Sequence, residues 1–100
     1  MSNKKTSSDV KERSATKEPS LYKVILLNDD YTSMEFVIEV LMGVFNKSAI
    51  AAQEIMLAVH KTGAGLAGVY PKDIAETKVA IVEHIAKRQE YPLKCKVERE

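Results

Sequence analysis

Three small polar residues, Asn28, Asp29 and Asp30, separate an apolar segment (residues 21–27) from a segment with helical periodicity. Two carboxylates and an amide at such a strand-to-helix corner could bind a small cation or a polar group of a ligand. The same residues are also common in turns, because Asn and Asp side chains accept hydrogen bonds from their own backbone. Local sequence alone favours the ordinary turn over the binding corner.

A second candidate group lies in the predicted second helix. Met56, Val59 and His60 stand at positions i, i+3 and i+4, so they share one helical face. In one interpretation this face belongs to the core and His60 is a satisfied interfacial histidine. In the other, His60 completes a polar rim with Asn28 and Asp30. The floor beneath that rim would then be apolar and consist of Met34, Val37, Met56 and Val59.

Common catalytic motifs are absent from the sequence. It contains no G-x-S-x-G elbow, no glycine-rich phosphate loop and no H-E-x-x-H motif. Asp29 and Asp30 are adjacent in a turn and so tend to point apart, and they offer too few oxygens for Ca²⁺, which binds six to eight. We therefore expect no catalytic residue, no cofactor and no metal. A small metal-dependent hydrolase using Asp29, Asp30 and His60 is the alternative.

Length and composition predict one small domain with a tail. The chain has 100 residues, which is enough for one domain and too few for two. After Met1, the apolar residues of segment 1–20 are Val10 and Ala15. Such a segment buries too little apolar surface to offset the entropy lost on ordering. We predict a disordered extension over residues 1–20 and a folded domain over residues 21–100.

Charge and cysteine content indicate which partners and which redox environment to expect. The segment 1–20 holds five basic and three acidic residues, which leaves a net charge near −1 on residues 21–100. This balance argues against nucleic-acid binding, which needs clustered Lys and Arg. The sequence has no secretory signal and no run of membrane-spanning length. Cys95 is the single cysteine, so no internal disulfide forms, and a reducing, cytoplasmic setting is expected.

Hydrophobic periodicity predicts an α+β fold of order β-α-α-β-α-β. The predicted strands are residues 21–27, 65–70 and 93–97, and the predicted helices are residues 33–45, 49–61 and 71–90. A three-stranded, mostly antiparallel sheet with three helices packed on one side is the simplest arrangement. One buried stripe of the first helix is expected to consist of Val37, Val40, Leu41 and Val44.

The helix ends carry recognisable signals. Thr32, with Glu35 three residues later, has the spacing of a capping box. Ser48 is the expected N-cap of the second helix, and Gly63 follows that helix as a C-terminal glycine. Pro71 fits the first position of the third helix.

Taken together, four segments resemble the ClpS adaptor family. They are Y-K-V-I-L-L-N-D-D-Y-T-S-M-E-F-V (22–37), M-L-A-V-H (56–60), A-E-T-K-V-A (75–80) and P-L-K-C (92–95). The resemblance covers about residues 20–100 in order. It implies an adaptor without catalytic activity that binds substrates beginning with Leu, Phe, Tyr or Trp. Such adaptors deliver these N-degron substrates to a Clp ATPase, usually ClpA, for degradation by ClpP.

The resemblance also assigns roles to residues. Asn28, Asp30 and His60 would bind the substrate's α-amino group, with Asp29 nearby. The wall of the side-chain pocket would consist of Leu26, Leu27, Thr32, Met34, Val37, Met56, Val59 and Leu93. Ser33 stands where the family commonly has proline, and Leu26 where Ile is frequent.

The contact with the ATPase is expected elsewhere, on the third helix. The resemblance places Glu76 and Lys78 on the surface that meets the N-terminal domain of ClpA. The extension 1–20 would act in delivery, as the family's extensions do when the ATPase pore engages them. The expected partners are therefore this ATPase and N-degron peptides, with no nucleic acid and no membrane, and the expected state is a monomer.

Overall fold

The six expected elements occur in the expected order in the computed structural model, which describes residues 20–100. The predicted disordered extension therefore lies, apart from Ser20, outside the described residues. The elements are β1 (Leu21–Leu27), α1 (Met34–Gly43), α2 (Ala49–Thr62), β2 (Ala64–Pro71), α3 (Lys72–Arg88) and β3 (Lys94–Arg99). The predicted α+β fold class is confirmed.

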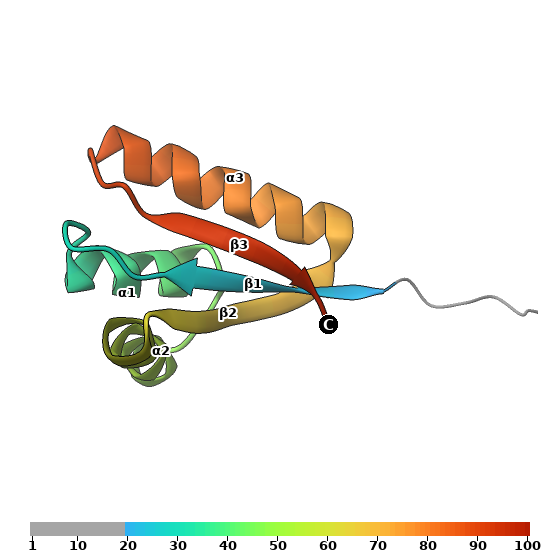
Figure 1. Ribbon diagram of the computed structural model, residues 1–100, viewed down its shortest axis with the longest axis horizontal. Coiled ribbons are helices and arrows are strands. Elements are labelled where there is room, and N and C mark those ends of the chain that lie inside the picture. Colours follow the sequence, from blue (N-terminus) through green and yellow to red (C-terminus); the bar gives the residue numbers. More distant parts are fainter. Residues whose placement is uncertain (1–19) are drawn as a thin grey trace, which may run out of the picture.

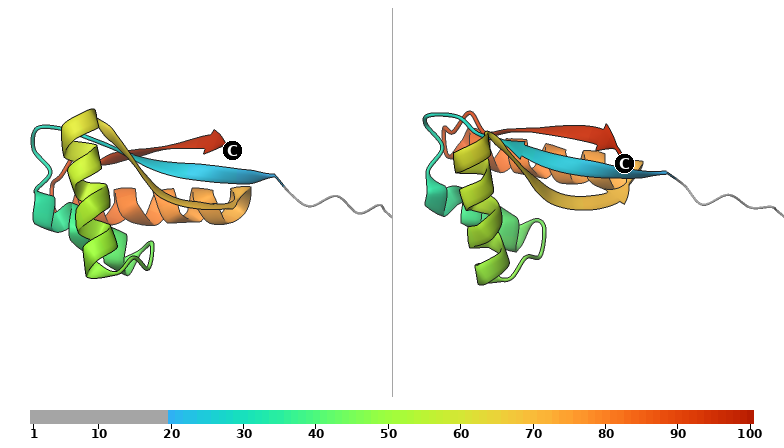
Figure 2. Two further views of the ribbon diagram at one scale, coloured as in Figure 1. Left: turned by 90° about the horizontal axis from the view of Figure 1, so that it is seen from below. Right: turned by 60° about the horizontal axis from the view of Figure 1, so that its bottom comes forward.

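The sheet has the strand order β2-β1-β3, and β1 pairs antiparallel with both neighbours (Figure 1). The helices lie together on one side of it (Figure 2). Alternate residues of β1 face these helices, and Val24 and Leu26 are fully buried. Leu27, the last residue of β1, pairs with the first residues of both other strands, Ala64 and Lys94. The chain therefore leaves β1 beside the end of α2.

The core is formed mainly by the inner side chains of β1 and the facing stripes of the helices. In α1 the predicted Val37, Val40 and Leu41 are buried, whereas Val44 is only half-buried. Val44 is the C-cap residue, and Phe36 and Phe45 complete the buried set in this region. The burial of this stripe fixes the rotation of α1, and with it the direction in which its first turn faces.

Two of the predicted helix ends differ from the structure. Ser33, not Thr32, is the N-cap of α1, and its Oγ accepts a hydrogen bond of 3.1 Å from the backbone N–H of Phe36. The hydroxyl of Thr32 donates instead to Asp29, so the next residue caps the helix and the capping box with Glu35 does not form. Pro71 is the last residue of β2 and the N-cap position of α3, one residue before the predicted place.

Both predicted ends of α2 are confirmed. The Oγ of Ser48 accepts from the backbone N–H of Ala51 at 3.1 Å. Gly63 follows the helix with φ of +92°, a left-handed conformation that suits glycine because it has no Cβ. The sharp end at Gly63 is what turns the chain directly into β2.

Candidate functional site

Asp29 braces the loop between β1 and α1. Its Oδ1 accepts hydrogen bonds from the backbone N–H groups of Tyr31 at 2.8 Å and Thr32 at 2.7 Å, and its Oδ2 accepts from the Thr32 hydroxyl at 2.7 Å. Burial raises the pKa of Asp29, but the hydrogen bonds from Thr32 and Tyr31 outweigh burial and lower the pKa below its usual value of 3.8. The charged carboxylate thus holds the loop in one conformation.

The same loop is attached to the end of α2. The backbone N–H of Asn28 donates to the carbonyl oxygen of Gly63 at 3.0 Å. Gly63 follows His60 by three residues, about one helical turn. This contact brings Asn28 and His60, which lie far apart in the sequence, to the same end of the sheet. Asn28, Asp30 and His60 are all exposed there.

These exposed polar side chains surround a cavity of about 410 Å³. Its lining consists of Asn28, Asp29, Asp30, Tyr31, Thr32, Ser33, Met34, Val37, Met56, Val59 and His60. The apolar residues deepest in the lining are Val37, Met56 and Val59, with exposed fractions of 6%, 9% and 3%. The cavity therefore has a buried apolar floor and a mouth rich in hydrogen-bond acceptors.

Nine of the twelve predicted peptide-binding residues line this cavity, and three do not. Leu26 is fully buried and Leu93 is 2% exposed, and both belong to the core. Leu27 follows Leu26 in β1, so its side chain points to the opposite face of the sheet from Leu26. None of these three leucines is in the cavity lining.

Two residues of the lining were not among the predicted site residues. Ser33 contributes as the N-cap of α1, and Tyr31 is 76% exposed at the mouth. A single aromatic residue between Asp30 and Thr32, in an otherwise polar turn, is the sequence signal that could have identified Tyr31.

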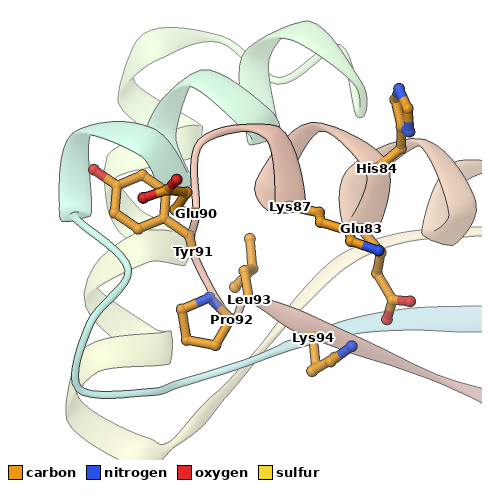
Figure 3. A pocket seen from close by; sticks show the side chains of 8 residues that line it. All are labelled: Glu83, His84, Lys87, Glu90, Tyr91, Pro92, Leu93 and Lys94. Atoms are coloured by element: carbon orange, nitrogen blue, oxygen red, sulfur yellow. The ribbon is translucent and has the colours of Figure 1, made fainter.

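A second hollow, of about 530 Å³, lies where α3 leads into β3 (Figure 3). It is lined by Glu83, His84, Lys87, Glu90, Tyr91, Pro92, Leu93 and Lys94. Four of these eight residues are charged and carry both signs, and three of the four, Lys87, Glu90 and Lys94, are exposed. Leu93 borders this hollow, not the cavity beside His60. The second hollow thus lacks a buried apolar floor of comparable extent.

Cys95 has no place in nucleophilic chemistry here. Burial, together with the nearby negative charge of Glu83, raises the pKa of the thiol to about 12. The thiol stays protonated at neutral pH and behaves as a small apolar residue of β3.

Within residues 20–100, no three His, Cys, Asp or Glu side chains are grouped so that they could hold a metal ion. The helices of this region are too short or too polar to cross a membrane.

Glu76 and Lys78 differ in their surroundings on α3. Glu76 is exposed, whereas Lys78 is half-buried. The Nζ of Lys78 donates to the carbonyl oxygen of Val44 at 2.7 Å and lies 5.3 Å from the centre of the Tyr70 ring. Lys78 therefore connects α3 to the C-terminal end of α1, where a positive charge is favourable because of the helix dipole.

A family model, ATP-dependent Clp protease adaptor protein ClpS, matches residues 17–96. The chain belongs to the ClpS family. ClpS proteins are adaptors of Clp protease, so this chain is an adaptor and not an enzyme. Family membership rules out the alternative of a metal-dependent hydrolase built on Asp29, Asp30 and His60.

Known ClpS proteins match most of the chain. The ClpS of Maricaulis maris is 58% identical over 90 residues, which are 90% of this chain and 83% of that protein. The ClpS of Desulfotalea psychrophila is 53% identical over 85 residues, which cover 85% of this chain and 83% of that protein. The solved structure of Agrobacterium tumefaciens ClpS2 bound to L-phenylalaninamide superposes with a TM-score of 0.80 and 42% identity. The match covers 83% of this chain and all of ClpS2.

Proposed function

We propose that this ClpS chain binds protein substrates whose first residue is Leu, Phe, Tyr or Trp, and delivers them to ClpA for degradation by ClpP. The observation that carries the proposal is the cavity of about 410 Å³, with its apolar floor and acceptor-rich mouth. Agrobacterium tumefaciens ClpS2 was solved with L-phenylalaninamide, a ligand that combines a free α-amino group with a bulky apolar side chain. Both halves of such a ligand suit the cavity.

The α-amino group is bound by Asn28, Asp30 and His60. An ammonium group has three donors and no acceptor, so it needs acceptors on several sides. The amide oxygen of Asn28, the carboxylate of Asp30 and a neutral imidazole nitrogen of His60 can supply them. All three line the mouth of the cavity. Asp29 adds a negative charge nearby while its oxygens hold the loop.

The first side chain of the substrate occupies the apolar part of the cavity. Burying a large apolar side chain contributes roughly 1.5–3 kcal/mol. Met34 lies at the mouth, 43% exposed, where its side chain excludes the β-branched residues Ile and Val. The wall comprises Thr32, Met34, Val37, Met56 and Val59. The predicted contribution of Leu26, Leu27 and Leu93 to this wall lacks support from the lining.

Delivery uses a different part of the molecule. Glu76 is exposed on α3 and is proposed to contact the N-terminal domain of ClpA. Lys78 contributes to the same surface through the position it gives to α3. The adaptor acts as a cytoplasmic monomer, without a cofactor, nucleic acid or membrane. Residues 1–20 serve in delivery and not in substrate binding.

Isothermal titration with a Phe-initiated peptide and its N-acetylated form tests substrate recognition. Acetylation removes the charge and part of the donor set, so the acetylated peptide should bind at least about thirty-fold more weakly. A Gly-initiated peptide of otherwise identical sequence controls for the side chain. Equal affinity for the free and acetylated peptides would refute recognition of the amino terminus.

Removal of residues 1–20 tests the division between binding and delivery. The truncated chain should bind the Phe-initiated peptide with unchanged affinity. Degradation of a Phe-initiated protein by ClpA and ClpP should slow, with a Clp substrate that needs no adaptor as the control. A parallel loss of peptide affinity would mean that the extension contributes to the pocket.

A further inference from the structure

Tyr31 is the most exposed large hydrophobic residue within residues 20–100, with 76% of its surface accessible. It lies in the lining of the cavity, directly after Asp30. The proposed binding of the first residue gives it no role, because the amino group is met by polar residues and the side chain by the buried floor. An exposed aromatic ring at the mouth of a binding cavity is a typical hot spot for recognition.

The backbone of Tyr31 is held in place before any substrate arrives. Its N–H donates to Asp29 Oδ1 at 2.8 Å, and the following residue, Thr32, makes two further bonds to the same carboxylate. A ring on a fixed backbone loses little conformational freedom when it is covered. Tyr31 is thus preorganised for contact.

The shape of the cavity determines where the rest of the substrate must pass. Val37, Met56 and Val59 close the floor, so the chain after the first residue can leave only through the mouth. Asn28, Asp30 and His60 form the polar part of the mouth, where the amino group binds. Its apolar part consists of Tyr31 and Met34, the latter 43% exposed.

We infer that Tyr31, together with Met34, forms a subsite for the side chain of the substrate's second residue. This inference rests on the proposed function. The subsite favours a large apolar or aromatic second residue, because such a side chain covers the tyrosine ring and the methionine thioether. The adaptor therefore selects substrates by two consecutive residues, the first in the cavity and the second at its mouth.

The test compares two peptides, Phe-Leu and Phe-Gly at positions one and two, with identical sequence after that. Wild type should bind the Phe-Leu peptide about five-fold more tightly. The Tyr31→Ala variant should reduce this preference to less than about two-fold and leave the affinity for the Phe-Gly peptide unchanged. The Tyr31→Phe variant keeps the ring and should keep the preference. Ile50→Ala removes an equally exposed side chain (72%) outside the cavity and should change nothing.

The other outcomes each overturn the inference in a distinguishable way. A preference that persists in Tyr31→Ala would place the second residue elsewhere. An equal loss of affinity for both peptides in Tyr31→Ala would mean that Tyr31 contacts the first residue or maintains the shape of the loop. Wild type with equal affinity for both peptides would show that no second subsite exists. Binding of neither peptide by wild type would remove the proposed function itself, and the subsite with it.

Discussion

Two hollows of this molecule differ in the residues that line them: one lies beside the end of α2 and the other where α3 leads into β3. The hollow near α3 is the larger, at about 530 Å³ against about 410 Å³. Its rim carries exposed side chains of both signs, such as Glu90 and Lys87. The smaller hollow has a buried apolar floor, and one of its acceptors, Asp29, is held by hydrogen bonds from the loop backbone. Polar acceptors above a buried apolar floor, and not volume, distinguish the proposed binding site.

Each hollow contains a carboxylate, a histidine and at least one apolar residue, so the difference can be tested with matched substitutions. Exposed charges of opposite sign interact weakly in water, typically by less than about 1 kcal/mol. Changes near α3 should therefore leave substrate binding nearly unaffected, while equivalent changes near α2 should not.

The largest effect is expected for Asp30→Ala. It removes the carboxylate that is proposed to accept from the substrate's amino group, and a hydrogen bond between charged groups contributes about 2 kcal/mol, or roughly thirty-fold in affinity. Titration with a Phe-initiated peptide measures this loss of affinity, and Glu83→Ala in the other hollow is the matched control. Similar losses in both variants would mean that general negative charge, and not a placed carboxylate, attracts the peptide.

Asp29 should behave differently from its neighbour Asp30. The Asp29→Ala variant leaves three donors of the loop without their partner, so the free energy of unfolding should fall by about 1.5 kcal/mol. Because folding lowers the pKa of Asp29, its contribution is complete above the usual value of 3.8 and disappears as the pH falls through the lowered pKa.

Urea unfolding of wild type and Asp29→Ala, at neutral pH and in acid, measures this contribution. The two proteins should differ at neutral pH and converge in acid. A constant difference across this range would show that the carboxylate's charge has no part in bracing the loop.

Sequence patterns predicted the elements well and the cavity only in part. β1 was predicted with its observed bounds, because an apolar run followed by three turn residues leaves little ambiguity. The sequence pattern assigns the N-cap of α1 to Thr32, because local patterns do not show that the Thr32 hydroxyl donates a hydrogen bond to Asp29 instead. The meeting of Asn28 and His60 depends on a backbone bond from Asn28 to Gly63, which no periodicity encodes.

Lys78 and Lys87 provide the next matched pair. Lys78→Met breaks the bond to the Val44 carbonyl and the contact with the Tyr70 ring, so unfolding free energy should fall by about 1 kcal/mol. Lys87→Met, on the rim of the hollow near α3, should change the free energy of unfolding by less than about 0.5 kcal/mol.

Binding of the ClpA N-terminal domain, measured beside stability, separates the roles proposed for Lys78 and Glu76 on α3. Glu76→Ala should weaken that binding without lowering stability, and the reverse result would move the ATPase contact away from Glu76.

The smallest effect concerns the histidines, one in each hollow: His60 near α2 and His84 near α3. His60 is proposed to accept a hydrogen bond from the substrate's amino group through an imidazole nitrogen. The His60→Ala variant should therefore bind a Phe-initiated peptide about threefold more weakly, since one neutral acceptor is lost. Titration with that peptide measures the change in affinity. His84→Ala, in the other hollow, is the matched control and should leave the affinity unchanged. Were His84→Ala alone to weaken binding, the hollow near α3 would have a part in binding that its mixed charges do not suggest.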